Sequence, residues 1–569
     1  MRKFTFLFSL LLIILIHFVA EWFFNQPQAV GADVPAGKLM SLSFAPFREG
    51  YSPLEEIFPL PEHVEEDVHL LADKTGSIRT YSSLGGMQPT PQFARKYGLK
   101  MIQGGWLSNV AKDNRKEVDA LIKSANENPD VVDRVIIGNE VLLRGELDVN
   151  RLIAYIREVK QAVKQPVSYA DVWSMYMKYP QLMHEVDFIT IHILPYWEDE
   201  PISIDHATEH LEKIVKQIED EARGIAPGKP ILIGESGWPA AGRQRGMATP
   251  SIINEAKFIR GLIEVANHHG FDYNIVEAFN QPWKSNLEGV VGANWGLFSA
   301  DRIPVFPLTG PVAENPRWQL HFGASSVLLL LFVGVFFKKL LPLSAFQSFV
   351  LLVLAQIFCM CLVAMADFLW YTSYSFWQRG YALIMIAANT VLGFCLLQRC
   401  HQLLEGGKAV AALAWRLRTL FWLFALLAIY KTFWLAVNGR YLSFPLEQFF
   451  IPVLGLIALL LLTTLVKRHL SWRLMALDQL IGWSFSGRKD KILGLSLLFA
   501  IFAMILGETR AFMLGADFIL AHPGFIEGLP IALEYTLKNM QLLFWLFSLL
   551  VLSMPFLANS CINNKKSGD

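Results

Sequence analysis

The chain has 569 residues, 53% of them hydrophobic and 18% charged, and its mean hydropathy is +0.35. Soluble domains carry about a quarter charged residues, so this composition excludes a disordered or collagen-like protein and favours a membrane protein. Fifty Lys and Arg residues balance fifty Asp and Glu residues. No net basic field is left to hold DNA or RNA, and no nucleic-acid partner is expected.

The N-terminus predicts a membrane anchor. Arg2 and Lys3 precede an apolar run over residues 4–24, which is long enough to span a bilayer. A signal peptide cleaved near residues 32–36 is the alternative, although signal peptides have a shorter apolar core. We therefore expect residues 1–25 to remain in the protein as a transmembrane helix.

The C-terminal part, residues 319–569, predicts a membrane domain of about seven further helices. Apolar runs of bilayer-spanning length lie at residues 320–340, 346–370, 380–398, 419–437, 447–466, 491–509 and 540–559. The five cysteines also lie in this half, in or beside apolar runs: Cys359, Cys361, Cys395, Cys400 and Cys561. They indicate neither a disulfide framework nor a zinc site.

The basic residues that flank the spans predict their orientation, because cytoplasmic loops are enriched in Lys and Arg. With residue 1 in the cytoplasm, the inner loops carry Arg2, Lys3, Lys338, Lys339, Arg399, Lys408, Arg416, Arg418, Lys467, Arg468, Arg473, Arg488, Lys489, Lys491, Lys565 and Lys566. The short outer loops carry only Arg379, Arg440, Arg510 and Lys538. We expect a multi-pass protein of the bacterial inner (cytoplasmic) membrane, with residues 26–318 on the periplasmic side.

Residues 26–318 predict an α/β fold, a (β/α)8 TIM barrel attached to the α-helical transmembrane bundle. Strand-like runs lie at residues 39–44, 77–81, 100–106, 135–139, 167–170, 188–193, 231–234 and 274–279, and helix-like stretches between them include residues 63–71, 116–125, 149–163, 207–222 and 254–268. A doubly wound open sheet is the alternative. It normally has a glycine-rich loop after its first strand, which is missing at residues 45–49.

Two carboxylates follow strands on opposite sides of the predicted ring, where a barrel places its chemistry. Glu140 follows the fourth strand and Glu235 follows the seventh. Glycosidic bond cleavage needs two carboxyl groups, one protonated as an acid and one ionised as a nucleophile. Surface acids after buried strands are the structural alternative. This pair predicts a glycosidase.

Aromatic and polar residues at the other strand ends are candidate sugar binders. Five tryptophans follow five different strands, namely Trp106, Trp173, Trp197, Trp238 and Trp283. Their flat faces suit stacking on sugar rings. The alternative is that they pack loops onto the barrel rim. Arg79, Tyr81, Glu277 and Lys284 are further candidates. His192 is interpreted as a lone, hydrogen-bonded barrel residue, and no metal or cofactor is expected.

Three motifs resemble those of glycoside hydrolase family 17, the β-1,3-glucanases. They are IGNEV at residues 137–141, GESGWP at 234–239 and NWGLFS at 294–299, and the resemblance covers about residues 38–310. It implies a retaining barrel with Glu140 as acid/base and Glu235 as nucleophile. It also implies that Asn139 binds the sugar 2-hydroxyl and that Tyr196 hydrogen-bonds the nucleophile. Plant members carry an acidic residue where this chain has Gln281, so this chain departs from the family pattern near strand eight.

The anchor, barrel and multispan tail together resemble bacterial membrane proteins that build or remodel β-glucans. This resemblance implies a glucan donor, a glucan acceptor and a lipid bilayer as partners. Partner proteins in glucan synthesis remain unidentified. No nucleotide-sugar transferase motif is present, and Trp472 stands isolated. We therefore predict a β-1,3-glucan transglycosylase. A plain β-1,3-glucan hydrolase and a non-enzymatic glucan-binding scaffold are the alternatives. Ionisable residues near the outer span ends, Asp367, Lys431, Glu508 and Arg510, suggest a polar platform or structural ion pairs.

Overall fold

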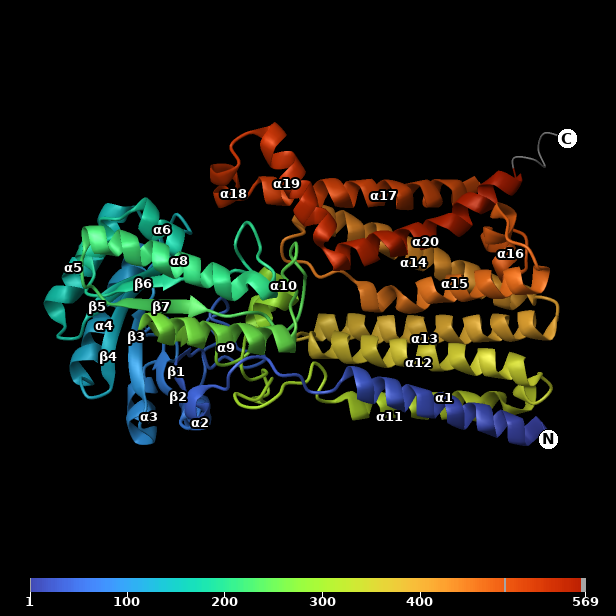
Figure 1. Cartoon of the computed structure of the whole chain (residues 1–569), viewed down its shortest axis with the longest axis horizontal. Coiled ribbons are helices and arrows are strands. Elements are labelled where there is room, and N and C mark those ends of the chain that lie inside the picture. Colours follow the sequence, from blue (N-terminus) through green and yellow to red (C-terminus); the bar gives the residue numbers. More distant parts are fainter. Residues whose placement is uncertain (1, 486–487, 564–569) are drawn as a thin grey trace. The chain divides into compact units, whose positions relative to one another are not determined.

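The computed structural model describes residues 2–485 and 488–563. The chain forms two compact units (Figure 1), Pro27–Glu314 and the combination of Met1–Gln26 with Asn315–Asp569. Each unit has its own buried apolar core. Lys565 and Lys566, two of the predicted cytoplasmic charges, lie outside the described residues.

The unit Pro27–Glu314 is a closed barrel of eight parallel strands arranged in chain order, which confirms the predicted fold. The strands are β1 (Leu39–Ser43), β2 (Thr75–Arg79), β3 (Lys100–Gly105), β4 (Val132–Asn139), β5 (Val167–Val172), β6 (Ile189–His192), β7 (Ile231–Ser236) and β8 (Asp272–Ile275). The helices are α2 (Pro61–Leu71), α3 (Thr90–Tyr97), α4 (Ala111–Glu127), α5 (Val149–Ala162), α6 (Trp173–Lys178), α7 (Leu182–Glu185), α8 (Ile204–Ile225), α9 (Ile252–His269) and α10 (Ser285–Ala293).

The last strand is shorter than its sequence suggests. The apolar run extends to Phe279, whereas β8 ends at Ile275. From Glu277 onward the backbone pairs with a later segment, because the Glu277 amide donates to the Trp295 carbonyl and the Leu297 amide donates to the Glu277 carbonyl, both at 2.9 Å. The family-like motif at residues 294–299 thus continues the sheet beyond β8.

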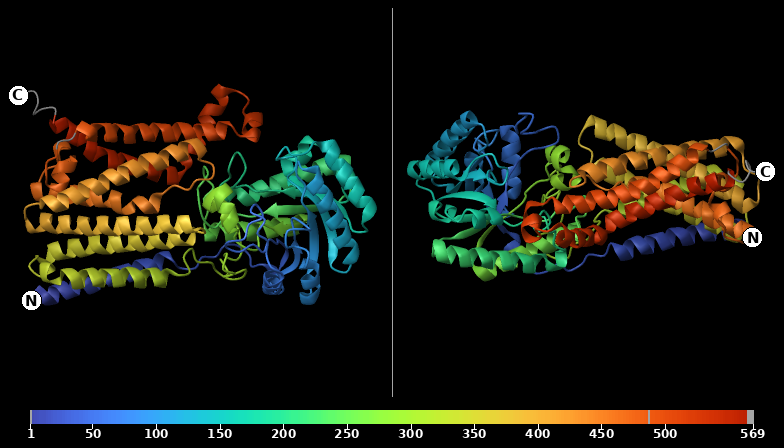
Figure 2. Two further views of the ribbon diagram at one scale, coloured as in Figure 1. Left: turned by 180° about the vertical axis from the view of Figure 1, so that it is seen from behind. Right: turned by 90° about the horizontal axis from the view of Figure 1, so that it is seen from above.

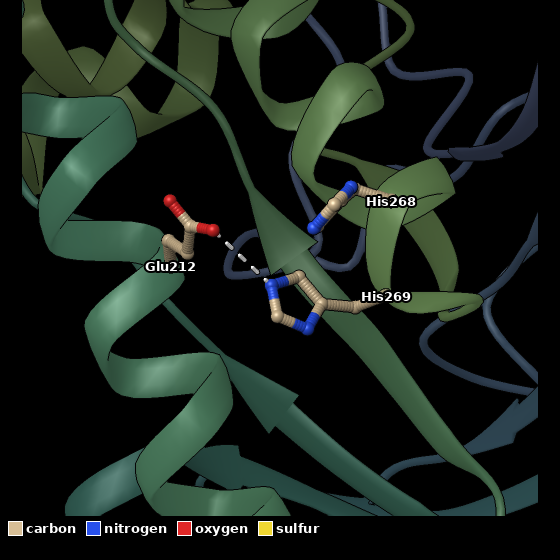
Figure 3. Close-up of side chains that lie close together, drawn as sticks. All are labelled: Glu212, His268 and His269. Atoms are coloured by element: carbon tan, nitrogen blue, oxygen red, sulfur yellow. Dashed lines mark hydrogen bonds and ion pairs between the residues drawn. The ribbon is translucent and has the colours of Figure 1, made fainter.

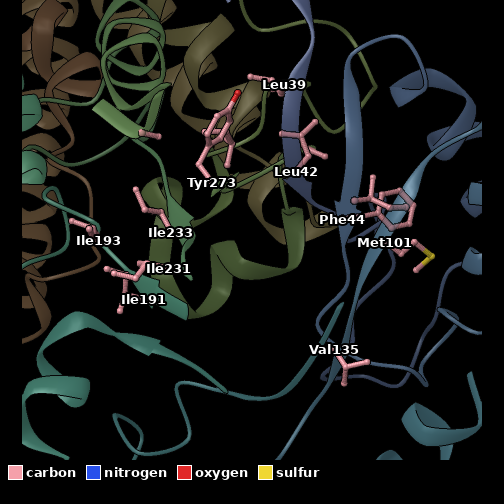
Figure 4. Close-up of a cluster of buried hydrophobic side chains, with 14 of the residues drawn as sticks. Leu39, Leu42, Phe44, Met101, Val135, Ile191, Ile193, Ile231, Ile233 and Tyr273 are labelled. Atoms are coloured by element: carbon pink, nitrogen blue, oxygen red, sulfur yellow. The ribbon is translucent and has the colours of Figure 1, made fainter. Parts of the chain in front are cut away.

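Side chains alternate between two apolar layers along the strands, as expected for a barrel. Met101, Ile137 and Ile233 belong to the large core that also contains residues of the surrounding helices, and Figure 4 shows part of this cluster. Ile102, Ile136, Ala170, Phe188 and Leu232 form a separate small cluster, which fills the inside of the barrel. Buried polar side chains also lie within the strands, such as Gln103 and Thr190.

Among its described residues, the other unit contains eight helices that are long and apolar enough to cross a membrane, and each predicted span lies in one of them. They are α1 (Arg2–Phe24), α11 (Trp318–Leu340), α12 (Ala345–Tyr371), α13 (Phe376–Glu405), α14 (Ala411–Asn438), α15 (Leu446–Lys467), α17 (Arg488–Met513) and α20 (Met540–Asn563). They run alongside one another in every view (Figures 1 and 2). Short helices connect some of them, namely α16 (Leu477–Ile481), α18 (Ala516–Ala521) and α19 (Phe525–Lys538).

Charged residues of this unit form ion pairs. Asp367 lies 3.2 Å from both Arg317 and His321. Arg418 lies 2.8 Å from Asp490 and 3.3 Å from Asp478. For Asp367 the structure therefore agrees with the ion-pair alternative of the sequence analysis.

Candidate active site

Glu140 stands at the end of β4 in an unusual backbone conformation. Its φ is 53°, and that of Gly138 is 86°. A Cβ atom at Gly138 would lie 3.2 Å from the Tyr169 ring, so only glycine fits there without displacement. The Glu140 amide still donates to the Ala170 carbonyl of β5 at 2.8 Å. A non-glycine residue with positive φ is uncommon, and such conformations gather at functional sites.

Glu235 lies within the last residues of β7, where its side chain is largely buried. Gly234 precedes it, and a Cβ atom there would come within 2.4 Å of the Thr190 methyl group. The missing side chain lets β7 pack closely against β6. The resulting register pairs Glu235 with His192.

The structure brings Glu140, His192 and Glu235 together. One atom from each side chain lies within 4.8 Å of the corresponding atoms of the other two. His192 Nδ1 is 2.7 Å from Glu140 Oε1, and His192 Nε2 is 3.6 Å from Glu235 Oε1. His192 is a hydrogen-bonded barrel residue, as the sequence analysis interpreted it, but it is not alone, because it approaches both carboxylates. Neighbouring strands of a parallel barrel end beside each other, and that rule could have placed His192 next to Glu235.

Arg79 at the end of β2 connects β4 and β7 through its hydrogen bonds. Its Nη1 donates to Glu235 Oε1 at 3.1 Å and to the Gly234 carbonyl at 2.8 Å, while its Nη2 donates to Asn139 Oδ1 at 2.6 Å. Charge-assisted bonds of this kind are stronger than neutral ones. Arg79 therefore fixes the orientation of both side chains and stabilises negative charge on Glu235.

The surroundings shift the pKa of carboxyl groups at this end of the barrel. Burial alone would raise the pKa of Glu140, but the hydrogen bond and charge of His192, with the charges of Arg144 and Arg79, bring it below its ordinary value. Asp171 at the end of β5 is fully buried, and that burial raises its pKa to about 6. Asp171 bonds to the Tyr169 hydroxyl, and the sequence analysis did not identify it as a site residue.

Glu277 and Lys284, which are two of the candidate sugar binders, form an ion pair with each other. Lys284 Nζ donates to Glu277 Oε1 at 2.9 Å. Burial raises the pKa of Glu277 to about 7 despite the nearby lysine. Gln281 is buried and donates to the carbonyls of Ala45 and Phe279 at 2.8 and 3.1 Å. The residue that departs from the plant pattern therefore has a structural role here.

The two candidate tyrosines differ in position. Tyr81 donates to Ser43 Oγ at 3.0 Å, and the Arg79 guanidinium carbon lies 5.1 Å from its ring centre. Tyr196 is fully buried and donates its single hydroxyl hydrogen to the Arg243 carbonyl rather than to Glu235. The expected hydrogen bond from Tyr196 to the nucleophile is thus not made in this structure, and Arg79 makes the bond to Glu235 instead.

The five tryptophans have different environments. Trp106 is 40% exposed, and the Arg144 guanidinium carbon lies 4.4 Å from its ring centre. Trp173, Trp197 and Trp283 are half-buried. Trp197 stacks on Trp295 at 6.2 Å with an interplanar angle of 17°, and Trp283 donates to Gln281 Oε1 at 2.9 Å.

Trp238 is the tryptophan that the structure removes from the list of sugar-stacking candidates. It has no exposed surface, and its Nε1 donates to the Thr249 carbonyl at 3.0 Å. Its ring packs on Tyr196 and Phe258 at centroid distances of 5.8 and 5.7 Å. For this residue the packing alternative is correct, because the turn after β7 folds it under the barrel rim.

In the part of the chain that the structure describes, two groups of side chains have the spacing of metal ligands. One is Glu140, His192 and Glu235 at the site itself. The other is Glu212, His268 and His269 on the outside of the barrel (Figure 3). Within the second group, Glu212 of α8 and His269 of α9 lie 3.4 Å apart, which accounts for it as a contact between neighbouring helices.

The sequence matches known proteins over the barrel. The family model described as the BtgE/BtgC glycoside hydrolase domain matches residues 42–296. A glucan 1,3-beta-glucosidase of Arthroderma benhamiae is 30% identical over 257 residues, which are 42% of this chain and 82% of that protein. The chain belongs to the BtgE/BtgC family of glycoside hydrolases.

Other members and structures are more distant. A probable beta-glucosidase btgE of Neosartorya fischeri is 27% identical over 271 residues, 46% of each protein. The chain therefore spans less than half of that relative. The solved glycoside hydrolase family 17 beta-1,3-glucanosyltransferase of Rhizomucor miehei is 28% identical and superposes with a TM-score of 0.41, covering 47% of this chain and 95% of its own. In this BtgE/BtgC member, all eight apolar helices lie outside the matched residues.

Proposed function

We propose that this glycoside hydrolase is a membrane-bound, retaining β-1,3-glucan transglycosylase, with Glu235 as nucleophile and Glu140 as acid/base. The observation that carries the proposal is the approach of the two carboxylates to within 4.8 Å. Retaining enzymes hold their carboxyl groups about 5–5.5 Å apart, whereas inverting enzymes need roughly 6.5–9.5 Å to admit a water molecule between them. The spacing supports retention through a covalent intermediate.

In the first step, a Glu235 oxygen attacks the anomeric carbon as the glycosidic C–O bond breaks. Arg79, bonded to Glu235 Oε1, holds that carboxylate in position for the attack. The leaving oxygen takes a proton from Glu140. Glu140 Oε1 lies 2.7 Å from His192 Nδ1, so the imidazole holds this carboxyl group in place.

In the second step, an acceptor hydroxyl attacks the anomeric carbon, its proton passes to Glu140, and the ester bond to Glu235 breaks. The positive charges that lower the pKa of Glu140 suit this role as a base. Asn139 is placed to contact the sugar that occupies the site. Its Oδ1 is held by Arg79, and its amide nitrogen has no protein partner among the described residues.

A glucan is the proposed substrate, with a second glucan as acceptor. The Arthroderma relative is named for glucan 1,3-linkages and the Rhizomucor protein for glucanosyl transfer. Hydrolysis is the second candidate function, favoured by the glucosidase names of the curated relatives, and it differs only in that water replaces the sugar acceptor.

We further propose that the eight apolar helices hold the protein in the cytoplasmic membrane of a bacterium, with the barrel on the periplasmic side. The excess of Lys and Arg in the predicted inner loops supports this orientation. Protease treatment of intact and of inverted membrane vesicles tests it. Cleavage of the barrel in inverted vesicles only would contradict it.

Product analysis with the full-length protein and laminarioligosaccharides of defined length tests the main proposal. We expect products longer than the donor, and an early product with the β-configuration by NMR. Products that are only shorter than the donor would identify a hydrolase. An early α-product would show inversion and overturn the assignment of a covalent intermediate.

Replacement of either carboxylate tests the roles of the two residues. Glu140→Gln and Glu235→Gln should each lower turnover by at least about 10²–10⁴-fold, the usual contribution of acid–base catalysis. Both variants should melt close to the wild-type temperature, because glutamine keeps the side-chain volume. Glu146→Gln is the control and should retain activity, because Glu146 bonds to Arg144 and is not one of the two proposed catalytic carboxylates. Full activity of Glu235→Gln would disprove the nucleophile assignment.

A further inference from the structure

Helix α19 (Phe525–Lys538) is a short helix of the unit that holds the apolar helices. It belongs to the segment that joins α17, which ends at Met513, to α20, which begins at Met540, and both of these helices are long enough to span. With 14 residues, α19 is about 21 Å long, which is too short for a hydrocarbon core of about 30 Å. Figure 1 shows α18 and α19 at one end of the helical bundle, beside the end of α17.

One face of α19 is packed against its own unit. Gly528, Ala532 and Thr536 recur every four residues and are buried. The Thr536 hydroxyl lies 3.1 Å from the Thr509 hydroxyl of α17, which fixes this face to the spanning helix. A Cβ atom at Gly528 would lie 3.2 Å from the Phe518 ring of α18, so the two short helices are also in close contact.

A second face is charged and exposed. It carries Glu527, Glu534 and Lys538. Lys538 forms an ion pair with Glu534 one turn earlier. These residues are suited to water.

The third face is apolar. It is exposed because no described residue of this unit covers it fully. Its members and their exposed fractions are Phe525 69%, Ile526 88%, Leu529 37%, Leu533 36% and Leu537 46%. At 100° per residue they cover an arc of about 120°, whose centre lies roughly 90° from the packed face and 130° from the charged face. The apolar surface continues on α18 through Leu520, which is 79% exposed.

We propose that this apolar face of α19, with Leu520, binds the lipid bilayer at the surface where α17 ends. A helix with one apolar and one charged face, held at the end of spanning helices, lies in the plane of the interface with its apolar side in the acyl boundary. The charge distribution of the loops assigns this surface to the outer leaflet. Lipid is favoured over a protein partner because α19 contacts α17 and α20, two spans that themselves expose apolar residues such as Leu506 at 71% and Phe544 at 57%.

Spin labels on neighbouring residues of α19 test the proposal in the full-length protein, reconstituted in phospholipid nanodiscs. Leu533→Cys and Ile526→Cys place the label on the apolar face, and Glu534→Cys and Glu527→Cys are matched controls one residue further on the charged face. All four positions are exposed or at the edge of exposure, so the label should not disturb folding. The spectrum of the labelled protein without an introduced cysteine is subtracted to remove the contribution of the native cysteines.

We expect labels at positions 526 and 533 to collide several-fold more often with oxygen, which concentrates in lipid, than with a water-soluble nickel chelate. Labels at 527 and 534 should show the reverse preference. Equal or reversed preferences at 526 and 533 would overturn the proposal. Low accessibility to both agents at these two positions would also overturn it, because protein rather than lipid would then cover the face.

Discussion

His192 contacts both carboxylates of the pair. Its two ring nitrogens lie 2.7 Å from Glu140 and 3.6 Å from Glu235, so that a single buried side chain contacts both proposed catalytic groups. Together with Arg144 and Arg79 it lowers the pKa of Glu140 against the effect of burial. The active site thus depends on a residue that carries none of the bond-forming chemistry.

This dependence predicts a shift in pH profile. In His192→Gln, the positive charge is lost while burial remains, so the pKa of Glu140 should rise. The acid form of Glu140 then persists to higher pH, and the alkaline limb of kcat/KM should move to higher pH. His210→Gln, which removes a histidine 2.7 Å from Glu198 elsewhere in the barrel, should leave the profile unchanged. An alkaline limb that moves to lower pH would contradict the role of His192.

Trp106 and Trp238 follow similar strand ends and yet should respond differently to truncation. Trp238→Ala removes a fully buried ring and should destabilise the barrel by about 3–5 kcal/mol. Trp106→Ala removes a ring that is 40% exposed, so it should change the melting temperature little and raise KM for a glucan. Thermal melting and initial-rate kinetics on both variants distinguish the effects. An unchanged KM in Trp106→Ala would remove this residue from the binding site.

At the scale of elements, the spacing of β6 and β7 positions the site. Gly234 permits the approach because a side chain there would meet Thr190 of β6 at 2.4 Å, and the same approach pairs His192 with Glu235. The C-terminal ends of β2, β4, β6 and β7 thereby supply Arg79, Asn139, His192 and Glu235 to one place. No single element contains the site.

Gly234→Ala should therefore lower both stability and turnover, since β7 must move away from β6 to admit the methyl group. Gly224→Ala in α8 is a matched control, because a Cβ atom there meets nothing within 4 Å. It should stabilise the barrel by up to about 1 kcal/mol through the better helix propensity of alanine. Melting temperature and turnover are measured for both variants. Wild-type activity in Gly234→Ala would show that the close approach is dispensable.

At the scale of the whole molecule, all residues that contact the carboxylate pair come from the unit Pro27–Glu314. A protein limited to this unit should cleave laminarioligosaccharides at a rate comparable to the full-length chain, because its core and its site are intact. Rate, product length and linkage are compared between the two proteins. Loss of cleavage in a folded fragment would show that the membrane unit takes part in the chemistry, whereas a change in product pattern alone would assign it to acceptor handling.

The sequence by itself determined the parts of this protein that local pattern encodes. Span length and hydropathy located the eight apolar helices, because a bilayer sets one required length. Alternating strand and helix patterns gave the barrel, and the barrel rule then selected Glu140 and Glu235 from fifty acidic residues, since the chemistry lies at strand ends. These inferences need no knowledge of which side chains touch.

Only the tertiary structure decided which side chains meet. It moved the partner of Glu235 from Tyr196 to Arg79, buried Trp238, and joined His192 to both carboxylates. These outcomes depend on strand register, on the close approach at Gly234 and on a continuation of the sheet by residues 295–298, which are distant in the chain. The Tyr196 hydroxyl has one hydrogen to donate, and the Trp238 ring packs where neighbouring side chains leave space. Such contacts are therefore determined by the neighbours that the fold supplies and not by the position of the residue in the sequence.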